Sequence, residues 1–197
     1  MEKSGSGMEN KKSPLFMVAR YVFVSRMFYG MNNVLEIGCG NCYGTEIVLN
    51  RVNNLTAIDL DEKLLEEIKV PNSDKFKFKV HDIINNPVFG KFDGAYSLDV
   101  LEHIPKKNEE KFISNIAKSL DKNGVLIVGV PSMESQKYRT KKKRKMQINC
   151  KNYLQLKNLL LGYFHNVFIF SMNGEIVHTE MDQMVFYYIA ICCCRKV

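Results

Sequence analysis

The stretch VLEIGCGNCYGT, residues 34–45, combines a carboxylate with closely spaced glycines. Glu36 lies in a short run typical of a buried strand, and Gly38, Gly40 and Gly44 follow it. Glycines after a strand let a ligand approach the backbone closely, and the next helix offers unpaired N–H groups at its start. This arrangement is typical of a site for a nucleotide-like ligand.

Glu36 narrows the class of ligand. A carboxylate two residues before the first glycine would lie close to the place where a pyrophosphate rests, and like charges in contact in a partly dry site are costly. The loop also lacks the Lys-Ser/Thr ending of a P-loop, which argues against an NTPase. We therefore expect a phosphate-free, cationic ligand, and S-adenosylmethionine, with its ammonium and sulfonium, fits that description.

Three motifs, VLEIGCG, AIDLD and SLDVLEHI, resemble those of class I S-adenosylmethionine-dependent methyltransferases. The resemblance covers nearly the whole chain after Pro14. It implies a Rossmann-like domain that uses S-adenosylmethionine and releases S-adenosylhomocysteine. The Asn/Asp-Pro-Pro-aromatic motif of amino methylation on nucleobases is missing after SLD, which disfavours an exocyclic base nitrogen as acceptor.

The resemblance also implies roles for individual residues. The cofactor-binding residues are expected to be Glu36, Gly38, Cys39, Gly40, Asp59, Leu60, Asp82, Ile83, Ser97 and Leu98. Glu36 would orient the methionine end, Asp59 would accept hydrogen bonds from the ribose hydroxyls, and Asp82 would accept from the adenine amino group. The family usually has glycine where this chain has Cys42, so a positive φ there would cost stability and weaken cofactor binding.

His103, in the motif DVLEH, is the candidate catalytic base. It follows the fourth predicted strand, at the edge where ligands of such sheets bind, and could take a proton from a hydroxyl acceptor. The alternative is that it packs over the cofactor or caps a helix. Of its neighbours, Asp99 is expected to face the ligand more than Glu102. Arg20 could pair with the cofactor carboxylate, although an ordinary surface arginine is the favoured interpretation.

The elements that would position these residues alternate along the chain. Strands are predicted at residues 33–37, 55–59, 75–81, 94–98 and 125–130, and helices at 44–52, 62–69 and 108–120. A helix starting at Pro14 precedes them, and a helix with two further strands follows, the two strands forming an antiparallel pair. We expect an α/β, Rossmann-like, doubly wound and mostly parallel seven-stranded sheet with an antiparallel last strand, helices on both faces and an N-terminal helix.

The length and composition of the chain fit a single domain. We expect residues 14–197 to form one methyltransferase domain and residues 1–13, with SGSGM, to be a flexible or expression-derived tail. The longest apolar run, residues 184–194, is shorter than the roughly 20 residues needed to span a bilayer, so we expect a cytoplasmic protein. Cys39 and Cys42 form a CxxC without a second pair, and no metal site is expected.

The formal net charge of +7 arises largely in KKKRK, residues 141–145. This run is either a solvated loop or a segment that binds phosphate groups. Our main hypothesis is methyl transfer to a small-molecule or sugar-like acceptor at oxygen. Two alternatives stay open: a protein that binds S-adenosylmethionine without turnover, and a methyltransferase for RNA or another polyanion that uses residues 141–145. The oligomeric state is left open.

Overall fold

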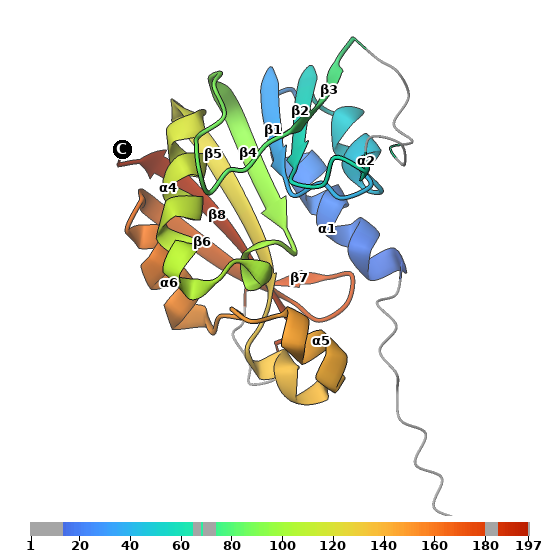
Figure 1. Cartoon of the computed structure of the whole chain (residues 1–197), viewed down its shortest axis with the longest axis vertical. Coiled ribbons are helices and arrows are strands. Elements are labelled where there is room, and N and C mark those ends of the chain that lie inside the picture. Colours follow the sequence, from blue (N-terminus) through green and yellow to red (C-terminus); the bar gives the residue numbers. More distant parts are fainter. Residues whose placement is uncertain (1–13, 65–67, 69–73, 180–184, 197) are drawn as a thin grey trace, which may run out of the picture.

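The computed structural model describes residues 14–64, 68, 74–179 and 185–196 (Figure 1). Its strands are β1 (Asn33–Ile37), β2 (Asn54–Asp59), β3 (Phe76–Val80), β4 (Phe92–Leu98), β5 (Leu120–Pro131), β6 (Phe164–Met172), β7 (Val177–His178) and β8 (Tyr187–Arg195). The helices are α1 (Pro14–Met27), α2 (Thr45–Leu49), α4 (Glu109–Ser119), α5 (Lys141–Met146) and α6 (Tyr153–Leu161), with 3₁₀ turns η1 (Leu101–His103), η2 (Lys106–Asn108) and η3 (Glu134–Tyr138). The tail at residues 1–13 and residues 65–67 and 69 of the helix predicted at 62–69 lie outside the described residues.

The described strands form one eight-stranded sheet in the order β3-β2-β1-β4-β5-β8-β6-β7. The first five strands in this order are parallel, and β8 pairs antiparallel with both β5 and β6. The doubly wound, mostly parallel sheet with antiparallel C-terminal strands is therefore confirmed. The predicted count of seven strands is wrong, because the short β7 folds back on β6 through Ser171–His178 and Met172–Val177, a pairing too short to leave a sequence pattern.

Helices cover both faces of the sheet (Figure 1). On one face, apolar residues of α1 and α2 pack on alternate residues of the central strands, among them Val34 of β1. On the other face, α4 and α6 pack on the intervening residues, such as Leu35 and Ile37 of β1. Because successive strand residues point to opposite faces, Glu36 shares the α1 and α2 side with Val34.

Local sequence signals account for the ends of the helices. Asn152 caps α6 through a reciprocal pair of hydrogen bonds with Gln155, a capping box. Gly30, with a φ of 78°, follows α1 and turns the chain into β1. Within the described residues, none of the helices is long and apolar enough to cross a bilayer.

Candidate active site

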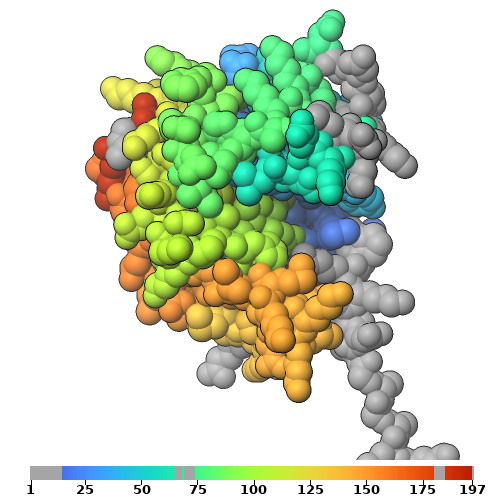
Figure 2. Space-filling view, viewed as in Figure 1, coloured from blue at the N-terminus to red at the C-terminus, as the bar shows by residue number. Residues whose placement is uncertain are grey.

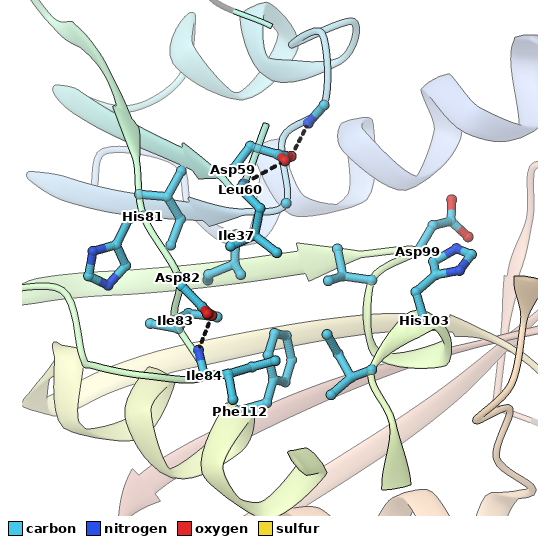
Figure 3. Close-up of a pocket in the computed structure, with 15 residues that line it drawn as sticks. Ile37, Asp59, Leu60, His81, Asp82, Ile83, Ile84, Asp99, His103 and Phe112 are labelled. Carbon is cyan, nitrogen blue, oxygen red and sulfur yellow. Dashed lines mark hydrogen bonds between the residues drawn. The ribbon is translucent and has the colours of Figure 1, made fainter. Parts of the chain in front are cut away.

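A cavity of about 330 Å³ opens where β1 to β4 end (Figure 3). The parallel register brings these ends together, since Ile37 pairs with Ile58 of β2 and with Ser97 of β4, and Asp59 pairs with Val80 of β3. The sheet order reverses between β1 and β4, and such switch points are where ligands of open α/β sheets bind. The cavity therefore lies where the sequence predicts a cofactor.

The glycine loop after β1 forms one wall of the cavity. Gly38 has a φ of 72°, and a Cβ built there would overlap Cγ2 of Val100. A side chain at Gly38 is thus excluded both by backbone conformation and by the close approach of the segment after β4. The backbone itself lines the cavity at this point.

Cys42 takes the conformation that glycine would favour. Its φ is 59°, which costs a non-glycine residue about 1–2 kcal/mol. Cys42 N donates to the carbonyl of Cys39 at 3.0 Å, and Thr45 N donates to the carbonyl of Cys42 at 3.2 Å. The loop therefore keeps the glycine path and bears the strain, as expected if Cys42 needs a positive φ.

Asp59 ties the second strand end to the glycine loop. Its Oδ2 accepts from Gly40 N at 2.8 Å, and its Oδ1 accepts from Leu60 N at 2.7 Å and from Asp61 N at 3.3 Å. A carboxylate has about four acceptor positions, so capacity remains for a hydroxyl on the cavity side. Leu60, 62% exposed, lines the cavity beside it and offers apolar surface.

Asp82 and Ile83 form the part of the wall that follows β3. Asp82 Oδ1 accepts from Ile84 N at 2.9 Å, and its Oδ2 accepts from the Asn85 side chain at 2.7 Å. These bonds fix the turn, and Figure 3 shows Asp82 and Ile83 on the same side of the cavity. Ile83 is buried and supplies an apolar floor.

Glu36 is a buried carboxylate beneath the loop. It is 2% exposed, and its Oε2 accepts from the Thr45 hydroxyl at 2.6 Å. Burial raises the pKa of Glu36 to about 7, although the Thr45 hydrogen bond favours the ionised form. Glu36 is therefore poised to ionise when a positive charge comes near.

Arg20 of α1 is buried, which corrects the expectation of a surface arginine. It is 1% exposed and forms an ion pair with Asp99, the residue that follows β4 by one position and lines the cavity. Its guanidinium carbon also lies 4.9 Å from the ring centroid of Phe16 and 4.6 Å from that of Tyr187. Sequence reasoning missed this placement because Tyr187 is distant in the chain.

His103 lies at the mouth of the cavity, 41% exposed (Figure 3). Its Nδ1 is 2.8 Å from the carbonyl oxygen of Met146, the last residue of α5. A carbonyl only accepts, so the ring proton of neutral His103 sits on Nδ1 and Nε2 carries the lone pair. The buried Glu102 lies 3.8 Å from Nε2 and would stabilise a protonated ring.

Residues 35–128 match a family described as a methyltransferase domain. Over these residues the chain is similar to methyltransferase domains, as the sequence motifs predict. The predicted cofactor, S-adenosylmethionine, agrees with the S-adenosylhomocysteine that a similar solved structure contains.

Three similar proteins extend the comparison. A stretch of 94 residues is 31% identical to ribosomal RNA small subunit methyltransferase A of Malacoplasma penetrans (strain HF-2), covering 44% of this chain and 31% of that protein's length. N-methyltransferase NodS of Bradyrhizobium japonicum WM9, crystallised with S-adenosylhomocysteine, has a TM-score of 0.73 at 16% identity, with 97% of this chain and 93% of that chain covered. A S-adenosylmethionine-dependent methyltransferase of Clostridium acetobutylicum ATCC 824 has a TM-score of 0.70 at 13% identity, with coverage of 90% and 91%.

Most of the predicted residues meet in the cavity. Those that line it are Gly38, Gly40, Asp59, Leu60, Asp82, Ile83 and His103. Glu36, Cys39, Ser97 and Leu98 are buried beside it and do not line it. The hydroxyl oxygen of Ser97 is buried without a hydrogen-bond partner among the described residues. The cofactor contacts of all these residues stay predictions.

The cavity is also lined by residues that sequence reasoning missed. His81 precedes Asp82, and its Nε2 is 2.9 Å from the carbonyl oxygen of Asn86. Val100 closes over Gly38, and Phe112 reaches the cavity from α4. Only His81, next to a predicted ligand residue, had a signal in the sequence; Val100 and Phe112 are apolar residues that tertiary packing brings to the cavity.

Proposed function

We propose that the protein transfers a methyl group from S-adenosylmethionine to a hydroxyl of a small-molecule or sugar-like acceptor, with His103 as the base. The observation that carries this proposal is the ring of His103, whose Nδ1 is held by the Met146 carbonyl at 2.8 Å while Nε2 is left as the basic atom at the mouth of the cavity. The methyltransferase family match of residues 35–128 supports the reaction class.

The residues of the cavity fit the cofactor. Gly38 leaves room for close approach to the backbone, Asp59 keeps acceptor capacity for ribose hydroxyls, and Leu60 and Ile83 offer apolar surface for adenine. Glu36, poised to ionise, suits an ammonium group. When bound, the cofactor supplies a methyl group activated on a sulfonium.

The chain's own residues then have defined tasks. Nε2 of His103 would accept the proton of an acceptor hydroxyl as the oxygen becomes the nucleophile. Glu102, at 3.8 Å, would stabilise the imidazolium that forms. Arg20 holds Asp99 at the cavity wall and so fixes the segment that carries η1 and His103. Positioning of the acceptor by this wall supplies much of the remaining rate, as expected for an in-line displacement.

Asp59→Ala is expected to weaken S-adenosylmethionine binding by about 1–3 kcal/mol, because it removes charge-assisted hydrogen bonds to the ribose and frees the Gly40 N–H. Calorimetric titration measures this change. Asp61→Ala is the matched control, since the Asp61 side chain accepts from the nearby Lys63 N at 3.0 Å and Asp61 does not line the cavity. Equal affinities for the two variants would refute the role of Asp59.

Methyl transfer itself is tested with methyl-labelled S-adenosylmethionine and a panel of hydroxyl, amino and thiol acceptors. Label transferred to a hydroxyl compound, together with S-adenosylhomocysteine formation, is the expected result. Tight cofactor binding without release of the methyl group to any acceptor would favour the alternative of a non-catalytic binding protein. Transfer only to nitrogen or sulfur would contradict the oxygen acceptor.

A further inference from the structure

Residues 137–145 hold the excess positive charge of the chain. This segment, named here the basic segment, contains seven lysines and arginines and no acidic residue, which equals the formal net charge of +7 for the whole chain. Most of these cations are exposed, and only Arg139 and Lys143 are half-buried. The remainder of the chain is therefore balanced in charge, and the surplus is concentrated at one place.

The charges of α5, within the basic segment, oppose the formation of the helix. Lysines 141 to 143 occupy its first turn, where the positive end of the helix dipole disfavours cations. Lys141 and Lys145 repel each other at i,i+4 spacing. No side chain of α5 is buried, and among the described residues none of its cations forms an ion pair with an acidic side chain. An anionic partner would relieve this repulsion.

The structure fixes α5 beside the candidate active site. The carbonyl of Met146 accepts from Nδ1 of His103 at 2.8 Å, and Asn149 N donates to the carbonyl of Glu102 at 3.0 Å. In Figure 1, α5 lies beyond the end of β5, and in Figure 2 it forms the lower end of the face shown, in orange. A molecule bound along α5 would thus reach the mouth of the cavity.

An exposed aromatic ring accompanies these cations. Tyr138 is 50% exposed, Lys137 Nζ lies 4.9 Å from its ring centroid, and Phe186 supports it with a centroid distance of 5.7 Å. Surfaces that bind single-stranded nucleic acid combine cations, which contact phosphates, with aromatic rings, on which bases stack. Tyr138 supplies the basic segment with such an aromatic ring.

We propose that the basic segment binds single-stranded RNA and that the methyl acceptor is a sugar hydroxyl of that RNA. This inference rests on the proposed methyl transfer and names the class of its acceptor. The cations of α5 contact the phosphates, Tyr138 stacks on a base, and a neighbouring ribose reaches Nε2 of His103. About three phosphate contacts predict that log affinity falls with log salt with a slope of about −2 for a single strand.

The test is fluorescence anisotropy with a labelled oligouridine about 12 nucleotides long, from about 50 to about 200 mM salt, without cofactor. The variant K141Q/K142Q/R144Q/K145Q removes four cations and keeps residues that favour helices. The control K77Q/K79Q/K118Q/K122Q removes the same charge from exposed lysines elsewhere. Thermal unfolding of both variants verifies that they fold.

We expect the first variant to bind RNA at least about tenfold more weakly with a shallower salt slope, and the control to bind like the wild type. Absence of RNA binding by the wild type, an equal loss in both variants, or tighter binding to phosphatidylglycerol vesicles than to RNA would overturn the inference. RNA binding does not require the cofactor. If the wild-type protein bound RNA but not S-adenosylmethionine, only the proposed function would be refuted. If it transferred the methyl group to a small acceptor but did not bind RNA, only this inference would be refuted.

Discussion

Glu36→Gln is expected to raise the free energy of unfolding of the ligand-free protein at about pH 8 by about 3 kcal/mol. Burial raises the pKa of Glu36 from 4.5 to about 7 in the folded state. The folded state therefore holds this proton until about pH 7, whereas the unfolded chain releases it near pH 4.5. Glu36 thus contributes stability below pH 4.5 that is lost as the pH rises through 7, and glutamine has no such loss.

The measurement is chemical denaturation of both proteins at several pH values. The difference between variant and wild type should be small near about pH 5 and should grow up to about pH 8. Comparison with the wild type removes the contribution of all other titrating groups. A difference that does not change with pH would show that Glu36 ionises in the folded state as it does in the unfolded chain.

The same substitution should weaken S-adenosylmethionine binding by about 1.5–3 kcal/mol, the scale of a hydrogen bond to a charged group. An ionised Glu36 favours the ammonium of the methionine end, and glutamine carries no charge. Adenosine, which lacks that ammonium, is the control ligand and should bind both proteins equally. If adenosine and S-adenosylmethionine lost the same affinity, the effect would lie in the loop structure and not in the charge of Glu36.

His103→Ala is expected to lower kcat by about 100- to 10,000-fold with little change in cofactor affinity, as for removal of a general base. The reason is that the Met146 carbonyl holds Nδ1 of His103, so that Nε2 is the atom that would accept the proton of the acceptor hydroxyl. Steady-state rates at saturating cofactor test this prediction.

His81→Ala is the matched comparison for this rate effect. His81 lines the same cavity, but it follows β3, and its Nε2 is held by the carbonyl of Asn86 at 2.9 Å. Its loss should alter KM for the cofactor and spare kcat. An undiminished kcat for His103→Ala would reduce His103 to a packing residue, and a reduced kcat for both variants would point to a general distortion of the cavity.

Local sequence patterns could predict those residues of the site that lie at the end of a strand or just after it. Gly38, Asp59 and Asp82 each follow or end a short apolar strand, so the parallel sheet alone brings them to one edge. The sequence could not predict the burial of Arg20, since its contact with Tyr187 joins residues far apart in the chain. It also could not predict that α5 holds His103, because that contact depends on a backbone carbonyl and not on a residue type.

The position of β8 has a consequence for folding during synthesis. It is the last strand in the sequence, yet it lies between β5 and β6 in the sheet. Until β8 leaves the ribosome, β5 and β6 each expose an unpaired edge, and such edges can pair with other chains. The nascent protein thus stays vulnerable to aggregation until β8 has been synthesised, and Tyr187 reaches Arg20 only at that moment.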